Sequence, residues 1–235
     1  MLFKENKSLN FSKKTRSTKN IHYLIIHYTG MQSGRVSMDR LKNPKSRVSC
    51  HYFIERNGDI YKMVEDNKIA WHAGKSKWKD IKDMNKYSIG IEIQNKGHLI
   101  NYQNYSKKQI FSLIKLIKIL MKKYKIKKRN ILGHSDIAPL RKKDPGEKFP
   151  WNFLSKKGVA IWYPKKKLKK NDSNLEKRRE VFFKNIHKIG YRFFDLSRRS
   201  KKDRKIIIAF QRRFLPKEVN GKITHKTFKI SQLLA

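Results

Sequence analysis

The sequence is poor in cysteine, in acidic side chains and in long apolar runs. Cys50 is the only cysteine among 235 residues, so no disulfide within the chain contributes to its stability. No run approaches the roughly 18 apolar residues of a membrane-spanning helix. Residues 1–20 are polar and basic, without the apolar segment and small-residue cleavage site of a signal peptide and without a cysteine for a lipid anchor. These absences predict a soluble protein that stays in the cytoplasm.

Basic side chains far outnumber acidic ones. Lys and Arg number 59 against 18 Asp and Glu, which gives a formal net charge of +41. Such a charge attracts polyanions, so nucleic acid, an anionic membrane face and an anionic cell-wall polymer are candidate partners. The lysines are spread along the whole chain and form no single dense arm, which favours ordinary solvated surface charge. No nucleic-acid-reading motif accompanies them, so specific nucleic-acid binding is the least favoured function.

Five segments have the apolar patterns of β-strands, and one has the pattern of a long helix. The strands are predicted at residues 21–28, 49–55, 60–64, 88–94 and 130–133. Asn57-Gly58, between the second and third strands, is typical of a hairpin turn. Residues 106–124 have apolar side chains at helical spacing, and Ser106 and Gln109 form a capping-box pattern at their start. Strands separated by a helix predict an α/β fold, a mixed central β-sheet flanked by helices.

Changes in composition divide the chain into four parts. Residues 1–20 are predicted as a loose basic arm, and residues 21–164 as the α/β domain. Residues 165–175 are charged and weakly apolar, and we interpret them as a linker. Residues 176–235 contain short helical patterns and form too short a segment for a large core, which predicts a small C-terminal helical domain.

Residues 134–146 carry a histidine and an aspartate on one short segment. The segment follows a predicted strand and contains Pro and Gly, so we expect a stiff loop without helix or strand. His134 opens this loop and Asp144 lies near its end, while His27 ends the apolar run of the first strand. Two histidines and one aspartate that leave a fourth position open are typical of a catalytic zinc site.

Glu92 and Lys142 add two charged side chains to this set. The five residues are too far apart in sequence for one helical zinc motif, so they would have to converge from different strand ends and loops. Beside a zinc ion, Glu92 would act as the general base for a water molecule. Lys142 would stabilise the oxyanion of a tetrahedral intermediate. The reaction class that this set indicates is hydrolysis of an amide.

Each of these residues alone also fits a purely structural role. A histidine after an apolar strand is more often packed or hydrogen-bonded than metal-bound. Lys142 stands between two other basic residues and could be simple surface charge, and Asp144 before Pro145 could be only a turn former. The five residues taken together favour the catalytic interpretation.

Four further residues have chemistry of interest. Cys50 next to His51 could indicate a thiol nucleophile, but its apolar neighbours favour a small core residue. His51 and His72 are candidates for the wall of a substrate cleft. Trp71 could stack on a sugar ring, although core packing is the more common role of such a residue.

These residues stand in segments that resemble a known family, the zinc-dependent N-acetylmuramoyl-L-alanine amidases of type 2. The family includes relatives of the lysozyme of phage T7 and of peptidoglycan recognition proteins, and the resemblance is strongest to its AmiD type. The matching segments are residues 25–29, 48–52, 70–74, 88–92, 133–146 and 149–151. Residues 208–214 together with Asn220-Gly221 resemble the helical peptidoglycan-binding module that such enzymes carry.

The resemblance implies a function and assigns roles to five residues. His27, His134 and Asp144 fall on the family's zinc ligands, with one Zn²⁺ per chain, and Glu92 and Lys142 fall on its catalytic positions. The implied reaction is hydrolysis of the amide between N-acetylmuramic acid and L-alanine in peptidoglycan or muropeptides. The implied fold is the mixed sheet of these amidases and of peptidoglycan recognition proteins.

Two alternatives remain open from the sequence. Some relatives of such enzymes only bind the cell wall, so a non-catalytic peptidoglycan-binding protein on the same fold is the alternative function. All five functional positions are filled here, which favours the enzyme. Enzymes of the AmiD type are exported lipoproteins, so the resemblance predicts the cell envelope or periplasm, whereas residues 1–20 predict the cytoplasm.

Overall fold

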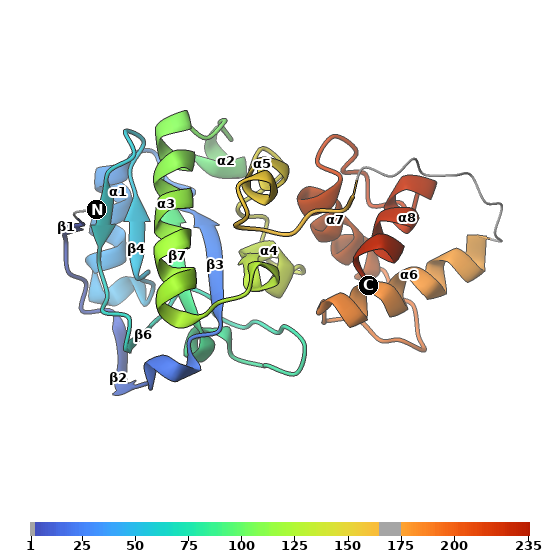
Figure 1. The fold of residues 1–235 in the computed structure, drawn as a ribbon, viewed down its shortest axis with the longest axis horizontal. Helices are drawn as coiled ribbons and strands as arrows, with labels where there is room; N and C mark the ends of the chain where they lie inside the picture. The colour runs from blue at the N-terminus through green and yellow to red at the C-terminus, as the bar shows by residue number, and fades with distance from the viewer. Residues whose placement is uncertain (1–2, 165–174) are drawn as a thin grey trace.

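A six-stranded mixed β-sheet forms the centre of the larger part of the molecule (Figure 1). The computed structural model describes residues 3–164 and 175–235. The strand order is β1-β5-β4-β7-β3-β8. In chain order these strands are β1 (Lys4–Glu5), β3 (Tyr23–Tyr28), β4 (Tyr52–Ile54), β5 (Ile60–Lys62), β7 (Ser88–Ile93) and β8 (Ile131–Gly133). A separate antiparallel pair joins β2 (Phe11–Thr15) to β6 (Lys68–Ala70).

The strands β4, β7, β3 and β8 run parallel to one another. A parallel sheet is covered on both faces, so its strands are apolar at successive positions. In β3 the side chains of Leu24, Ile25 and Ile26 are all fully buried. The predicted hairpin is confirmed, because β4 and β5 pair antiparallel. Gly58 lies in its turn with φ +92°, a conformation that L side chains rarely adopt.

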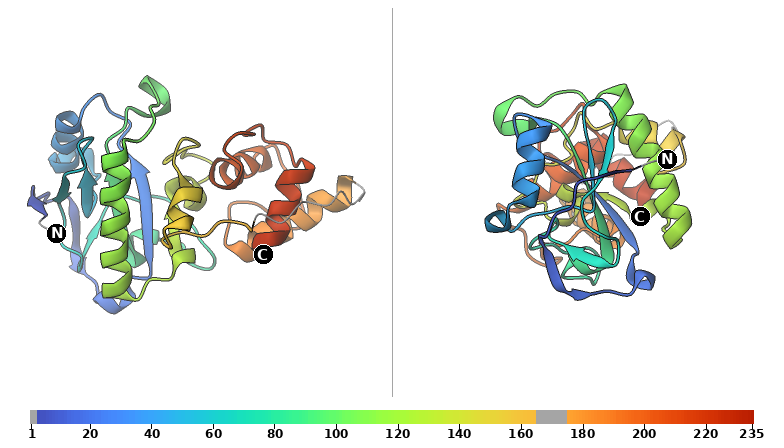
Figure 2. Two further views of the ribbon diagram at one scale, coloured as in Figure 1. Left: turned by 45° about the horizontal axis from the view of Figure 1, so that its top comes forward. Right: turned by 90° about the vertical axis from the view of Figure 1, so that its left-hand side faces the viewer.

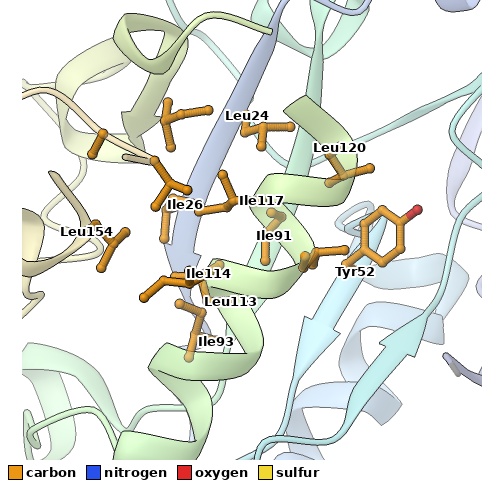
Figure 3. Close-up of a cluster of buried hydrophobic side chains, with 14 of the residues drawn as sticks. Leu24, Ile26, Tyr52, Ile91, Ile93, Leu113, Ile114, Ile117, Leu120 and Leu154 are labelled. Carbon is orange, nitrogen blue, oxygen red and sulfur yellow. The ribbon is translucent and has the colours of Figure 1, made fainter. Parts of the chain in front are cut away.

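Helix α3 (Lys107–Tyr124) covers one face of the sheet, and α1 (Gly34–Lys42) lies on the other (Figure 2). The predicted capping box is present, because Ser106 and Gln109 bond reciprocally. The main core lies between α3 and the sheet, where Leu113 and Ile117 pack against Leu24, Ile26 and Ile91 (Figure 3). A smaller cluster under α1 includes Cys50, which is a buried core residue as expected.

Three longer helices at the C-terminal end pack beside α4 (His134–Ile137) and α5 (Trp151–Lys156) (Figures 1 and 2). They are α6 (Leu175–Ile189), α7 (Asp203–Phe214) and α8 (His225–Leu234). They share one hydrophobic cluster with the sheet, in which Ile25 and Leu132 belong to strands and Phe182 and Phe210 to helices. The remaining short helices are α2 (Gly97–Ile100), η1 (Thr18–Asn20), η2 (Pro44–Ser46), η3 (Met84–Tyr87) and η4 (Lys128–Asn130).

The N-terminal segment differs from the loose arm that the sequence predicts. Strand β1 extends the main sheet and β2 pairs with β6. Buried Arg16 donates hydrogen bonds to the backbone carbonyls of Asp66 and Ser88, and the Asn10 amide group donates to that of Leu41. These polar side chains satisfy buried carbonyl groups, so the segment is ordered by hydrogen bonds and needs few apolar residues.

Two other expectations concern loops. The prediction of a loop without helix at residues 134–146 is wrong at its start, where the chain forms the short helix α4. The Asp136 side chain accepts from the Gly133 N–H (2.7 Å) and so stabilises the first turn. The predicted linker at residues 165–175 lies, except for its last residue, outside the described residues. Among residues 3–164 and 175–235, no helix is both long and apolar enough to cross a membrane.

Candidate metal-binding active site

The candidate site lies at the ends of three neighbouring parallel strands. His27 of β3 and Glu92 of β7 are direct partners in the register, so their side chains start from adjacent points on the sheet. Strand β8 pairs with β3 on its other side and ends at Gly133, so His134 follows at the same edge. Functional groups of α/β folds gather at the carboxyl ends of parallel strands. The topology thus brings together residues that are far apart in sequence.

His27, His134 and Asp144 converge on one point. The Nδ1 atoms of the two histidines are 2.9 Å apart. Asp144 Oδ2 lies 3.1 Å from His27 Nδ1 and 3.0 Å from His134 Nδ1. All three side chains are buried. The three residues that the sequence singles out as candidate ligands therefore present one donor atom each to a common centre.

The donor set fits a small divalent cation. Metal–ligand bonds of about 2.0–2.2 Å in a tetrahedral site place donor atoms roughly 3.3 Å apart, close to the spacings found here. Burial and the charge of His134 lower the pKa of His27 to about 4, which favours the neutral imidazole. Burial would raise the pKa of Asp144, but the two histidines outweigh it and hold this pKa well below its usual range. Neutral imidazoles and an ionised carboxylate are the forms that bind metal.

Hydrogen bonds behind the histidines fix which nitrogen faces the centre. His134 Nε2 lies 3.0 Å from the Ala73 carbonyl oxygen and donates to it, which leaves Nδ1 free as a ligand. His27 Nε2 lies 3.1 Å from His72 Nδ1, and His72 Nε2 lies 3.3 Å from Ser88 Oγ. The Ser88 hydroxyl donates to the Met84 carbonyl (2.6 Å). Each proton in this series of hydrogen bonds therefore points away from the metal-binding centre, which leaves His27 Nδ1 free as a ligand.

Glu92 is half-buried, and its Oε2 atom is buried and has no hydrogen-bond partner. Burial, with a smaller contribution from the charge of Asp144, raises its pKa to about 8, and the charge of Lys142 opposes this shift. A buried polar atom without a partner is costly and commonly marks a functional position. Lys142 lines the same cavity as Glu92, so the two predicted catalytic residues lie at one site.

A cavity of about 610 Å³ opens onto this group, and it falls within the usual size range of ligand pockets. Its wall includes Glu92, His134, Lys142 and Asp144. The three residues expected in the cleft wall, His51, Trp71 and His72, are not among those that line it. His51 is buried and accepts a hydrogen bond from the Gly90 N–H (3.0 Å), and His72 supports His27 from behind. Trp71 is partly exposed and does not line this cavity.

Comparison with known proteins agrees with this geometry. The family model described as N-acetylmuramoyl-L-alanine amidase matches residues 17–147. The chain belongs to this family. The amidase AmiD of Escherichia coli is 31% identical over 229 residues, which cover 91% of this chain and 82% of AmiD. The 1,6-anhydro-N-acetylmuramyl-L-alanine amidase AmpD of Haemophilus influenzae is 38% identical over 167 residues, which cover 63% of this chain and 88% of AmpD.

A solved structure of an amidase in this family confirms the predicted fold class. It is the complex of Escherichia coli AmiD with the substrate anhydro-N-acetylmuramic acid-L-Ala-D-gamma-Glu-L-Lys. Its TM-score is 0.83 at 29% identity, and the match covers 95% of this chain and 91% of that one. The match therefore extends through the C-terminal helices as well as the sheet.

The amidase chain also contains supporting residues to which sequence reasoning assigned no role. Asp136, two residues after His134, accepts from the Gly133 N–H and forms a buried ion pair with Arg213 of α7. The Tyr191 hydroxyl donates to its other oxygen (2.5 Å). Asp136 stands in the first turn of a short helix, and an acidic residue at this place is a local sequence pattern that predicts capping. No local signal points to its partners, which lie 55 and 77 residues away in sequence.

Proposed function

We propose that this chain is a zinc-dependent amidase that hydrolyses the bond between N-acetylmuramic acid and L-alanine in peptidoglycan or its fragments. One observation carries the proposal. Two imidazole nitrogens and one carboxylate oxygen lie within 3.1 Å of one another, beside a buried glutamate oxygen that has no hydrogen-bond partner. Membership of the amidase family and the muropeptide named for AmiD support the substrate class.

Zn²⁺ is the metal that fits these ligands best. His27, His134 and Asp144 offer two nitrogens and one oxygen, a set typical of catalytic zinc sites that keep a position open for substrate or water. When bound, the ion would supply a Lewis acid that polarises the amide carbonyl and makes the attacking water more acidic. Magnesium and calcium prefer oxygen ligands only, so a site with two imidazoles disfavours them.

Glu92 would move the proton. Its free Oε2 accepts a proton from water as the water oxygen bonds to the carbonyl carbon. The same carboxyl group then delivers this proton to the nitrogen of L-alanine as the carbon–nitrogen bond breaks. The products are the carboxylic acid of the muramic acid, which keeps the second proton of the water, and a free peptide amine. Because burial raises the pKa of Glu92 to about 8, its protonated form is stable enough to act as the acid in the second step.

Lys142 would stabilise the negative charge that develops on the carbonyl oxygen. Its side chain lines the cavity with Glu92 and Asp144. A fixed positive charge at a partly buried position acts more strongly than one in bulk water, and groups of this kind contribute several kcal/mol to transition-state stabilisation. We also propose residues 21–164 as the catalytic domain and residues 176–235 as a helical domain that binds peptidoglycan.

The proposal is tested by metal content and by turnover. The purified protein should hold one zinc per chain and should release stem peptide from an anhydro-muropeptide, as followed by chromatography and mass spectrometry. Chelation and Glu92→Gln should each abolish release, and zinc should restore only the chelated wild type. A zinc-loaded protein that retains muropeptides but cleaves none would instead support the non-catalytic binding protein.

A further inference from the structure

A second cavity adjoins the active site at the junction with α7. It has a volume of about 530 Å³ and lies between the loop after α4 and one side of α7. Seven cationic side chains line it and no acidic one does. Three are residues 141–143 of the loop, and the other four are Lys201, Arg204, Lys205 and Arg212. We refer to this space as the junction cavity.

Little within the described residues neutralises this charge. Arg212 pairs with Glu147 (3.3 Å). Arg204 and Lys205 reach only backbone carbonyl oxygens, at 3.5 and 3.4 Å, and Arg141 donates to the backbone carbonyl oxygens of Lys75 and Ala73. Among residues 3–164 and 175–235, no carboxylate forms an ion pair with Lys142, Lys143 or Lys201. A hollow lined by one sign of charge concentrates ions of the opposite sign, so the junction cavity favours an anionic ligand.

The junction cavity adjoins the active-site cavity. Residues 141–143 line both cavities, so a ligand at Lys142 in the active site lies next to the junction cavity and α7. The other end of the active-site cavity is mostly uncharged, with Thr29, Met31, Val48 and Leu99 among its lining residues and Arg40 as the exception. The combined groove is therefore mostly uncharged at one end and strongly cationic at the other.

The substrate of the proposed reaction has the same asymmetry. On the sugar side the lactyl carboxyl group is consumed in the scissile amide, so no free carboxylate remains next to the bond. On the peptide side each γ-linked glutamate leaves an α-carboxylate free, and the chain ends in another carboxylate, as in the AmiD ligand with D-gamma-Glu and L-Lys. Arg and Lys side chains bind carboxylates through charge-assisted hydrogen bonds.

We propose that the junction cavity binds the free carboxylates of the stem peptide, and that α7 supplies half of this subsite. The sugar then lies over the uncharged end of the groove. This inference rests on the proposed amidase function and adds to it a direction for the substrate and a source of specificity. It also gives the C-terminal helices a direct contact with substrate, in addition to any binding of intact peptidoglycan.

The test compares two substrates that differ only in charge. One is anhydro-N-acetylmuramic acid-L-Ala-D-γ-Glu-L-Lys, and the other is the same compound with both free carboxyl groups amidated. The cationic side chains on the α7 side are exposed, so each carboxylate should contribute about three- to tenfold, and amidation of both should lower wild-type kcat/KM roughly 10- to 100-fold. The loss should appear mainly in KM, and rising salt should reduce the difference.

Variants on α7 and just before it assign this preference to the junction cavity. In the triple variant Lys201→Gln, Arg204→Gln, Lys205→Gln, the ratio of kcat/KM between the two substrates should fall to near one. The double variant Lys201→Gln, Lys205→Gln keeps Arg204 and its contact with the Asn220 carbonyl, and should lower the ratio part of the way even if the triple variant is poorly folded. The matched control is Lys115→Gln, Lys118→Gln, Lys122→Gln on the exposed side of α3, which changes the charge equally and should leave the ratio within twofold of wild type.

The possible outcomes separate this inference from the function on which it rests. Cleavage of both substrates at equal rates, with no effect of the α7 variants, overturns the subsite and leaves the amidase intact. Failure to cleave either substrate overturns both. Equal cleavage combined with inhibition by polyphosphate that the triple variant relieves would assign the cavity to phosphate and overturn the carboxylate assignment.

Discussion

Replacing Glu92 by glutamine should stabilise the metal-free protein while it abolishes activity. Glu92 is half-buried, its buried Oε2 has no hydrogen-bond partner, and burial raises the pKa of the carboxyl group from 4.5 to about 8. A raised pKa means that the folded chain holds this proton more tightly than the unfolded chain does. The resulting stability is fully present below pH 4.5 and is lost as the pH rises to 8, at about 1.4 kcal/mol per pH unit. Between pH 4.5 and pH 8 the loss in the free energy of unfolding amounts to about 5 kcal/mol. Relaxation around the ionised group makes the actual loss smaller.

The assay is urea unfolding of both proteins in EDTA between pH 5 and 8, followed by tryptophan fluorescence. Glutamine has a similar shape and does not ionise, so the variant should gain stability relative to wild type as the pH rises, reaching about 2–5 kcal/mol at pH 8. Buried histidines titrate in both proteins, and their contribution cancels in the difference. The exposed control Glu5→Gln should change the free energy of unfolding by less than about 0.5 kcal/mol throughout. The argument would be refuted if the difference in the free energy of unfolding between Glu92→Gln and wild type did not change with pH.

Two further predictions concern residues that support the metal ligands. Arg213→Met leaves Asp136 as a buried charge without its ion-pair partner, and should cost about 3–5 kcal/mol in the free energy of unfolding by urea; a loss below 1 kcal/mol would contradict this role. His72→Ala removes the acceptor of the His27 Nε2 proton and should weaken zinc binding about 10- to 100-fold in competition with a chelating dye. The exposed His22→Ala is its control, and equal zinc affinity in the two variants would contradict the prediction.

The sequence predicts the sheet, the long helix and the convergence of the candidate ligands because each has a local signal. Continuous apolar runs mark parallel strands buried on both faces, and a capping box marks the start of α3. Once the strands at 21–28, 88–94 and 130–133 are recognised as parallel neighbours, the residues at their ends must meet at one edge. His27 and His134 are therefore predictable from position along the chain as well as from family resemblance.

The remaining features depend on partners that the sequence does not identify. Residues 3–20 have little apolar periodicity, and their order comes from buried groups such as Arg16, whose acceptors are 50 and 72 residues away. The sequence places His72 in the cleft wall, because a histidine between Trp71 and Ala73 gives no sign of which face it occupies. Only the fold shows that it lies behind His27, 45 residues away in sequence.

The C-terminal helices bear on the geometry of the site as well as on the proposed binding of peptidoglycan. Arg213 and Tyr191 hold Asp136, and Asp136 in turn holds the backbone of Gly133 at the point where the chain turns from β8 into His134. The same helices share a hydrophobic cluster with β3 and β8, the strands on either side of the candidate ligands. A shift of these helices would therefore move His134 relative to His27. Because metal affinity depends on the placement of ligands to within a few tenths of an ångström, the sheet alone would hold zinc less tightly than the whole chain.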